Sequence, residues 1–180
     1  MRQLLGWATL TAMLTLSACG GGSPYYAPRS STAVRPAPPQ ANAPAVSAAT
    51  FVAENASFDL FVIRSSELAL QRSQSGRVRD FAAQMIDAHK GTSAQLSLEG
   101  RRLNLLPSAI LRPSEETMLD GLQSSSRFDV DYVRDQRLVH QQQVTLDAAY
   151  AARGASPTLR PVAAAALPIE QRHLRLIAYL

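Results

Sequence analysis

Apolar residues recur every three or four positions through most of the chain, which is the spacing of amphipathic helices. The pattern predicts helices over about 51–73, 78–96, 118–153 and 156–180. No segment alternates apolar and polar residues as a half-buried strand would. The sequence therefore predicts an all-α domain built as an antiparallel four-helix bundle, because helices with one broad apolar face bury it against one another.

Glycine and proline mark the connections between these patterns. Gly76 interrupts the pattern after the first helix, and the two prolines of "NLLPSAILRPSEE" indicate a longer connection. Ser114 is a plausible N-cap, since Glu115 and Glu116 follow it in a first turn that favours carboxylates. The stretch "QSSSR" then interrupts the apolar spacing. The pattern leaves open whether residues 113–122 form a separate helix.

The last helix has its own start signal and an internal breaker. Ser156 is expected to cap it, with Pro157 in the first helical position. Pro168 lies inside the pattern, and proline lacks the backbone N–H that an interior position uses. A kink or a division of the helix is expected there.

The first 18 residues predict a bacterial lipoprotein signal. After Arg2, the mostly apolar run that ends at Leu16 is too short for a bilayer, which needs about 20 residues. Leu16, Ser17 and Ala18 precede Cys19, the cysteine expected to carry the lipid and become the mature N-terminus. An ordinary secretory signal is the alternative, but Cys19 is the only cysteine of the chain.

Residues 19–49 predict a disordered linker, and residues 50–180 the helical domain. The linker holds most of the prolines and no acidic residue, so it cannot bury enough apolar surface to offset its ordering entropy. Gly20 after the cysteine favours transport to the outer membrane. We therefore expect a domain that is anchored in the cell envelope by lipid and faces the periplasm.

The charge of the chain restricts its partners. The net charge of +4 comes from arginines, with Lys90 as the only lysine. These arginines are expected to form a solvated face, which could contact an envelope protein, peptidoglycan or lipopolysaccharide. The basic residues do not cluster beyond Arg101 and Arg102, so no nucleic-acid partner is expected.

The three histidines of the chain fall on three different predicted helices. His89 and His173 each lie on the apolar stripe of their own helix, and His140 has Val133 and Val144 at helical spacing. Glu170 lies three residues before His173, and Glu67 of the first helix could complete a set. Dinuclear carboxylate sites are built in such bundle interiors.

The chain offers fewer carboxylates than a dinuclear site requires. Such sites use a Glu from two helices and a Glu-x-x-His pair from the other two, whereas only "IEQRH" supplies that pair here. A mononuclear site with three histidines and one acid, of the kind zinc or copper tolerates, is the alternative. The ligand count favours histidines that are buried and bonded to a carbonyl or to an acid such as Asp87. No cofactor is therefore predicted, with a divalent metal as the alternative.

Three segments resemble a known family. "FVAENASFDLFVIRSSELALQRSQSGRVRDFAAQMIDAHK", "FDVDYVRDQRLVHQQQVTLDAAYA" and "LPIEQRHLRLIAYL" are similar to the ferritin-like bacterial family catalogued as domain of unknown function 4142. The resemblance covers residues 51–180 and implies a ferritin-like four-helix fold in exported, often lipid-anchored envelope proteins. It implies no activity. The chain departs from the family at two places. Val62 stands where the first helix usually has an acid, for which Glu67 would be a substitute. Ala88 separates Asp87 from His89, whereas the family usually has Asp and His adjacent.

Two functions are consistent with these patterns. The chain has no Gly-rich phosphate loop, no Gly-x-Ser-x-Gly elbow and no cysteine left for catalysis. The preferred interpretation is a non-enzymatic, tethered module that binds an envelope partner or supports envelope integrity. The alternative is a metal buffer or oxidase that uses the bundle-interior His and Glu side chains. The alternative requires imidazoles within about 4–5 Å of a common point, because metal–nitrogen bonds are near 2 Å.

Overall fold

The structure is a computed structural model that describes residues 45–180, and its regular elements are all helices. The five helices are α1 Ala48–Arg72, α2 Gly76–Arg101, α3 Pro113–Ser124, α4 Phe128–Arg153 and α5 Arg160–Ile177. Within this part of the chain no strand forms, which confirms the all-α prediction. The predicted signal, Cys19 and the linker as far as residue 44 lie outside the described residues.

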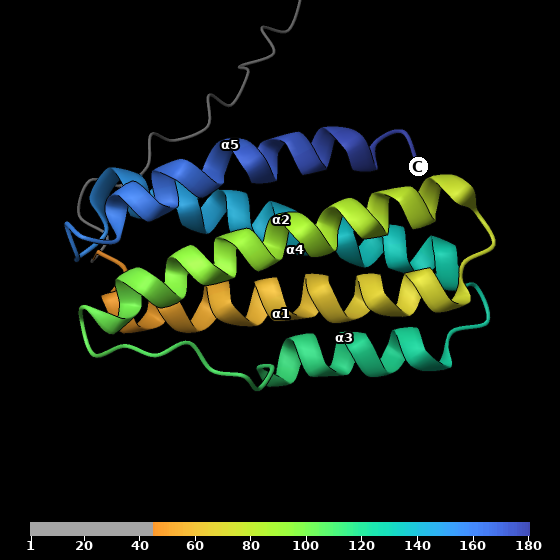
Figure 1. The fold of residues 1–180 in the computed structure, drawn as a ribbon, viewed down its shortest axis with the longest axis horizontal. Helices are drawn as coiled ribbons and strands as arrows, with labels where there is room; N and C mark the ends of the chain where they lie inside the picture. Colours follow the sequence, from red (N-terminus) through yellow and green to blue (C-terminus); the bar gives the residue numbers. More distant parts are fainter. Residues whose placement is uncertain (1–44) are drawn as a thin grey trace, which may run out of the picture. The chain divides into compact units, whose positions relative to one another are not determined.

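Helices α1 and α2 form an antiparallel hairpin with a three-residue connection, Ser73 to Ser75 (Figure 1). Serine caps both helices: the Ser47 hydroxyl accepts from the Thr50 N–H, and the Ser75 hydroxyl accepts from the Val78 N–H. These bonds satisfy amide groups that have no partner inside the helix. Helix α1 starts at Ala48, so the described helical domain begins two residues before the predicted boundary.

The segment left open by the sequence forms a helix of its own, α3, which packs against α1 and α4 (Figure 1). The predicted cap at Ser114 is wrong. Helix α3 begins at Pro113, and Arg112 occupies the N-cap without a side-chain bond. The Ser114 hydroxyl instead donates to the buried carboxylate of Glu115, 2.7 Å away, so a side-chain partner replaces the expected backbone partner.

The start predicted for the last helix is also wrong. Residues 157–159 form a turn, and α5 begins at Arg160. The Ser156 carbonyl accepts from the N–H groups of Leu159 and Arg160, so Ser156 contributes its backbone and not a side-chain cap. Helix α5 continues through Pro168 without division, because residues on both sides of the proline are packed in the interior.

The long helices enclose one apolar interior. Helix α1 packs against α2 and α4, and α5 packs against α4 and α2. The row Phe51, Phe58, Val62 and Ala69 of α1 is buried, and the Phe51 ring stacks on Tyr150 with centroids 3.9 Å apart. Among residues 45–180, no helix combines the length and the apolar character needed to cross a membrane.

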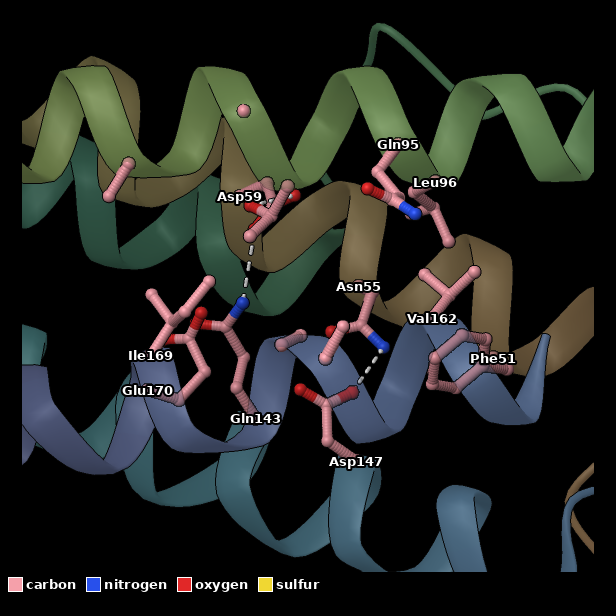
Figure 2. Close-up of a pocket in the computed structure, with 15 residues that line it drawn as sticks. Phe51, Asn55, Asp59, Gln95, Leu96, Gln143, Asp147, Val162, Ile169 and Glu170 are labelled. Atoms are coloured by element: carbon pink, nitrogen blue, oxygen red, sulfur yellow. Dashed lines mark hydrogen bonds between the residues drawn. The ribbon is translucent and has the colours of Figure 1, made fainter.

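A polar layer interrupts this interior. Asn55 of α1 donates to Asp147 of α4 over 3.2 Å, and both side chains are buried (Figure 2). Buried polar groups cost free energy unless they are bonded or paired. The histidines of the chain lie in the same layer.

Candidate metal centre

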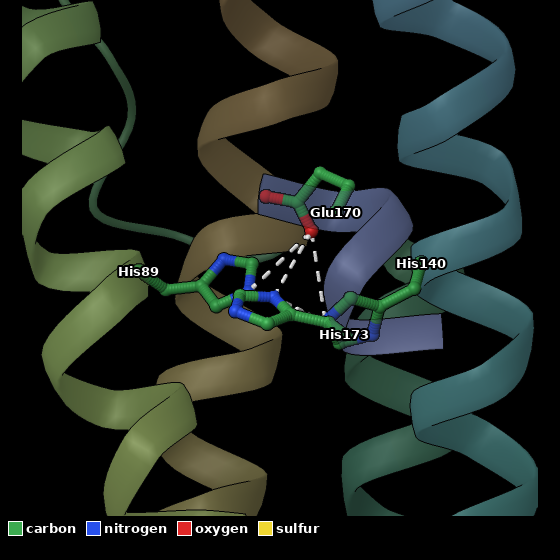
Figure 3. Close-up of side chains that lie close together, drawn as sticks. All are labelled: His89, His140, Glu170 and His173. Carbon is green, nitrogen blue, oxygen red and sulfur yellow. Dashed lines mark hydrogen bonds and ion pairs between the residues drawn. The ribbon is translucent and has the colours of Figure 1, made fainter. Parts of the chain in front are cut away.

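Four buried side chains converge from three helices (Figure 3). They are His89 of α2, His140 of α4, and Glu170 and His173 of α5, called here the histidine cluster. One nitrogen from each histidine and one oxygen from Glu170 all lie within 4.8 Å of one another. The rings therefore face one point and do not occupy separate pockets.

The short distances in the cluster involve a single atom of each side chain. His140 Nε2 lies 3.3 Å from His89 Nε2 and 3.3 Å from His173 Nδ1. Glu170 Oε2 lies 3.7 Å from His89 Nε2, 3.6 Å from His140 Nε2 and 3.5 Å from His173 Nδ1. The carboxylate oxygen thus stands almost equally far from all three nitrogens.

Five of the six separations are close to those of a tetrahedral donor set, and the sixth, between His89 Nε2 and His173 Nδ1, is within 4.8 Å. Donor atoms of a regular tetrahedron are about 1.6 bond lengths apart, which gives ~3.3 Å for metal–nitrogen bonds of about 2.0–2.1 Å. Direct hydrogen bonds account for the same positions less well, because one neutral imidazole nitrogen cannot donate to and accept from several neighbours at once. The four atoms are positioned to surround one small cation.

Neighbouring groups fix two of the rings. Asp59 of α1 accepts from His89 Nδ1 over 2.8 Å, and the Gln136 carbonyl accepts from His140 Nδ1 over 2.7 Å. A ring that donates through Nδ1 keeps the lone pair of Nε2 for a metal. Both Nε2 atoms point into the cluster. The carboxylate–histidine pair is the usual outer partner of a metal-bound imidazole.

Asp59 is itself held by four donors. The hydroxyls of Thr92 and Ser93 donate to its Oδ2 over 3.0 Å each, and the Gln143 amide donates to its Oδ1 over 3.1 Å (Figure 2). Together with the His89 ring, these bonds hold the carboxylate in one orientation in the interior. The orientation of the His89 ring is therefore set by three helices.

The electrostatics of the cluster favour a positive charge. Burial acts to lower the pKa of His89, but the carboxylates of Glu170 and Asp59 raise it above its ordinary value. Burial, with His89 and His173 nearby, lowers the pKa of His140 well below its ordinary value. Neither Glu170 oxygen has a hydrogen-bond partner. Two buried carboxylates beside three imidazoles would be neutralised by one divalent cation.

The structure unites four of the predicted ligands and leaves one apart. The cluster contains all three histidines and Glu170, whereas Glu67 lies on the exposed face of α1. Asp87 is also exposed and does not bond to His89, contrary to the expectation. Sequence reasoning missed Asp59. The available signal was its position on the buried face of α1, one turn after Asn55 and three residues before Val62.

Solved structures with a similar fold include two forms of one protein and a fragment of another. CopM in its Cu(II)-bound form superposes with a TM-score of 0.64 at 14% identity, covering 76% of this chain and 96% of CopM. A DUF305 fragment from Deinococcus radiodurans gives 0.64 at 16% identity, covering 75% and 96%. CopM in its Cu(I)-bound form gives 0.62 at 14% identity, covering 73% and 93%. At these identities the likeness concerns the fold alone.

Sequence comparison identifies the family. No curated protein matches the chain significantly. One family model, described as domain of unknown function (DUF4142), matches residues 33–180, which includes all helices of the described residues and the whole histidine cluster. The chain therefore belongs to the DUF4142 family.

Proposed function

We propose that this domain binds one divalent transition-metal ion, Cu2+ or Zn2+, in the histidine cluster. The observation that carries the proposal is the set of three imidazole nitrogens and one carboxylate oxygen, with the closest pairs 3.3 Å apart and the carboxylate 3.5–3.7 Å from each nitrogen. Imidazole donors suit both ions. Two of the similar folds are copper-bound forms of CopM, which supports copper.

The coordination is suited to holding a metal and not to catalysis. Catalytic zinc sites keep one position open for water or substrate, whereas here four protein atoms fill a tetrahedral shell. The ligands are buried, which limits the access of a substrate to the metal. We assign the domain the role of a metal buffer or carrier.

Elemental analysis of the purified mature protein tests this function. After incubation with copper or zinc and dialysis against a weak chelator, we expect about one ion per chain, because the histidine cluster offers one tetrahedral site. Cobalt substitution adds a geometric readout, since tetrahedral Co2+ absorbs visible light far more strongly than octahedral Co2+. A protein that retains no metal, or binds cobalt only octahedrally, refutes the proposal.

The scaffold and location belong to the same proposal. Helices α1, α2, α4 and α5 would form a ferritin-like four-helix bundle with α3 added outside, supported by the pairing of α1 with α2 and of α4 with α5. A lipid on Cys19 would place the domain at the periplasmic face of the outer membrane, supported by the signal pattern at residues 16–19. Labelling with palmitate in a bacterial host should mark the wild type and not Cys19→Ser. Equal labelling, or none, overturns the anchor.

A further inference from the structure

A cavity of about 150 Å³ lies beside the histidine cluster and shares Glu170 with it (Figure 2). Its lining comes from α1, α2, α4 and α5, and it is partly open to solvent. The rest of the cluster is nearly closed, since His89 and His140 are 0% exposed and His173 is 5% exposed. The cavity, called here the side cavity, therefore connects solvent with one ligand of the candidate metal.

The floor of the side cavity carries three carboxyl groups. Asp59, Asp147 and Glu170 line it, and its lining contains no Lys, Arg or His. Such a floor attracts cations and repels anions. Burial, with Glu170 nearby, raises the pKa of Asp147 to about 8, so this carboxyl group is mostly protonated at neutral pH while no cation lies beside it.

Buried oxygen atoms without partners gather on this floor. Among the described residues, buried side-chain atoms that lack a hydrogen-bond partner include Gln143 Oε1, Asp147 Oδ2 and both oxygens of Glu170. All three side chains line the cavity. Gln143 and Asp147 are 1% exposed, so bulk water does not compensate them. Oxygens left unpaired in this way are costly unless a cation or bound water completes them.

Small and exposed residues form the mouth. Gly91 of α2 and Ala165 of α5 are both exposed and both line the cavity. A Cβ atom added at Gly91 would meet no atom within 4 Å, so a larger side chain would extend into open space there. The apolar wall behind the mouth includes Phe51, Leu96 and Val162, which offer no ligand atoms. The exposed Gln95 and the half-buried Thr92 also offer oxygen atoms, and the acidic side chains form the buried part of the lining.

We propose that the side cavity is the route by which a divalent metal cation enters and leaves the histidine cluster, with Asp147 and Gln143 as transient oxygen ligands before Glu170. The proposal rests on the metal-binding function stated above. A route changes the rates of metal uptake and release, whereas the final ligand set stays the same. The route is therefore tested by kinetics and the function by the amount of bound metal.

A plug at the mouth tests the route. Gly91→Phe keeps a helical position and places a ring at the opening. Stopped-flow transfer of Cu2+ or Zn2+ from a chromogenic chelator to the metal-free protein should be slowed by about tenfold or more, the effect of a modest added barrier. Release to excess chelator should slow equally, so that the dissociation constant changes little. Gly121→Phe, at another exposed helical glycine with an open Cβ direction, is the matched control and should exchange at the wild-type rate.

A second variant keeps the route falsifiable if Gly91→Phe fails to fold. Asp147→Asn is nearly isosteric and leaves an oxygen to accept from Asn55, but it removes a floor carboxylate. Uptake should slow several-fold while the metal-to-protein ratio at saturation stays at the wild-type value. Wild-type exchange rates in a folded Gly91→Phe, or in Asp147→Asn, would overturn the route. A wild type that binds no metal would instead overturn the proposed function.

Discussion

Replacement of His140 by alanine is expected to lower the affinity for copper or zinc by about 100-fold or more. Four ligands of a structural zinc site share a binding free energy of about 10–16 kcal/mol, so the loss of one costs about 3 kcal/mol. His140 is the appropriate ligand to remove because its Nε2 lies 3.3 Å from both other ligating nitrogens. Competition titration against a chelator of known affinity measures the change.

A second variant of α4 separates affinity from stability. Tyr132→Phe removes a buried hydroxyl that is bonded to Ser66 over 2.8 Å, in the core but outside the cluster. It should lower the melting temperature of the metal-free protein and leave the metal affinity unchanged. If His140→Ala binds metal as tightly as Tyr132→Phe does, His140 is not a ligand and the four-atom centre is wrong.

The second large effect is expected at a residue that does not touch the metal. Asp59→Asn should lower the affinity by about 10- to 100-fold, the range found when an outer carboxylate partner of a ligating histidine is lost. The carboxylate now accepts from His89 Nδ1 over 2.8 Å and orients that ring. An amide would carry no charge and would turn its NH2 group toward donors such as Thr92. Isothermal titration calorimetry with the same ion should show the loss, with the stoichiometry retained.

The control for Asp59 lies on the same helix. Glu67→Gln removes a carboxylate from the exposed face of α1 and should bind metal as the wild type does. Comparison of Asp59→Asn with Glu67→Gln therefore shows which carboxylate of α1 supports metal binding. Equal effects in the two variants would mean that the overall charge of the helix matters and the bond to His89 does not.

Helix positions could be predicted from the sequence, but two helix starts could not. The apolar spacing of α1 and α2 is strong because it repeats over many turns. Ser114 and Ser156 are good caps by local preference alone. The hydroxyl of Ser114 is taken by Glu115, and the backbone of Ser156 is used in a turn. These partners come from the surrounding structure, and a local residue preference for the cap position carries no information about them.

The candidate site was predictable as a set of residues but not as a geometry. The spacing identifies one histidine on each of three helices and the pair Glu170–His173. Whether three rings meet depends on how each helix is rotated and shifted against the others, and this is decided by packing across the bundle. The same reason explains the choice of Glu67 in place of Asp59, since a shift of about two turns along α1 changes which acid reaches His89. Because the sequence supplies too few carboxylates for a dinuclear site, it favoured buried, hydrogen-bonded histidines over metal ligands.

Helix α5 contributes both to the histidine cluster and to the mouth of the side cavity. Its first half contributes Ala165 to the mouth of the side cavity, and its second half contributes Glu170 and His173 to the cluster. Pro168 lies between them and removes one backbone hydrogen bond from the helix. Because one helix holds both, a displacement of α5 would move part of the mouth and two of the four proposed ligands together. Access to the metal and its coordination are thus coupled through a single helix.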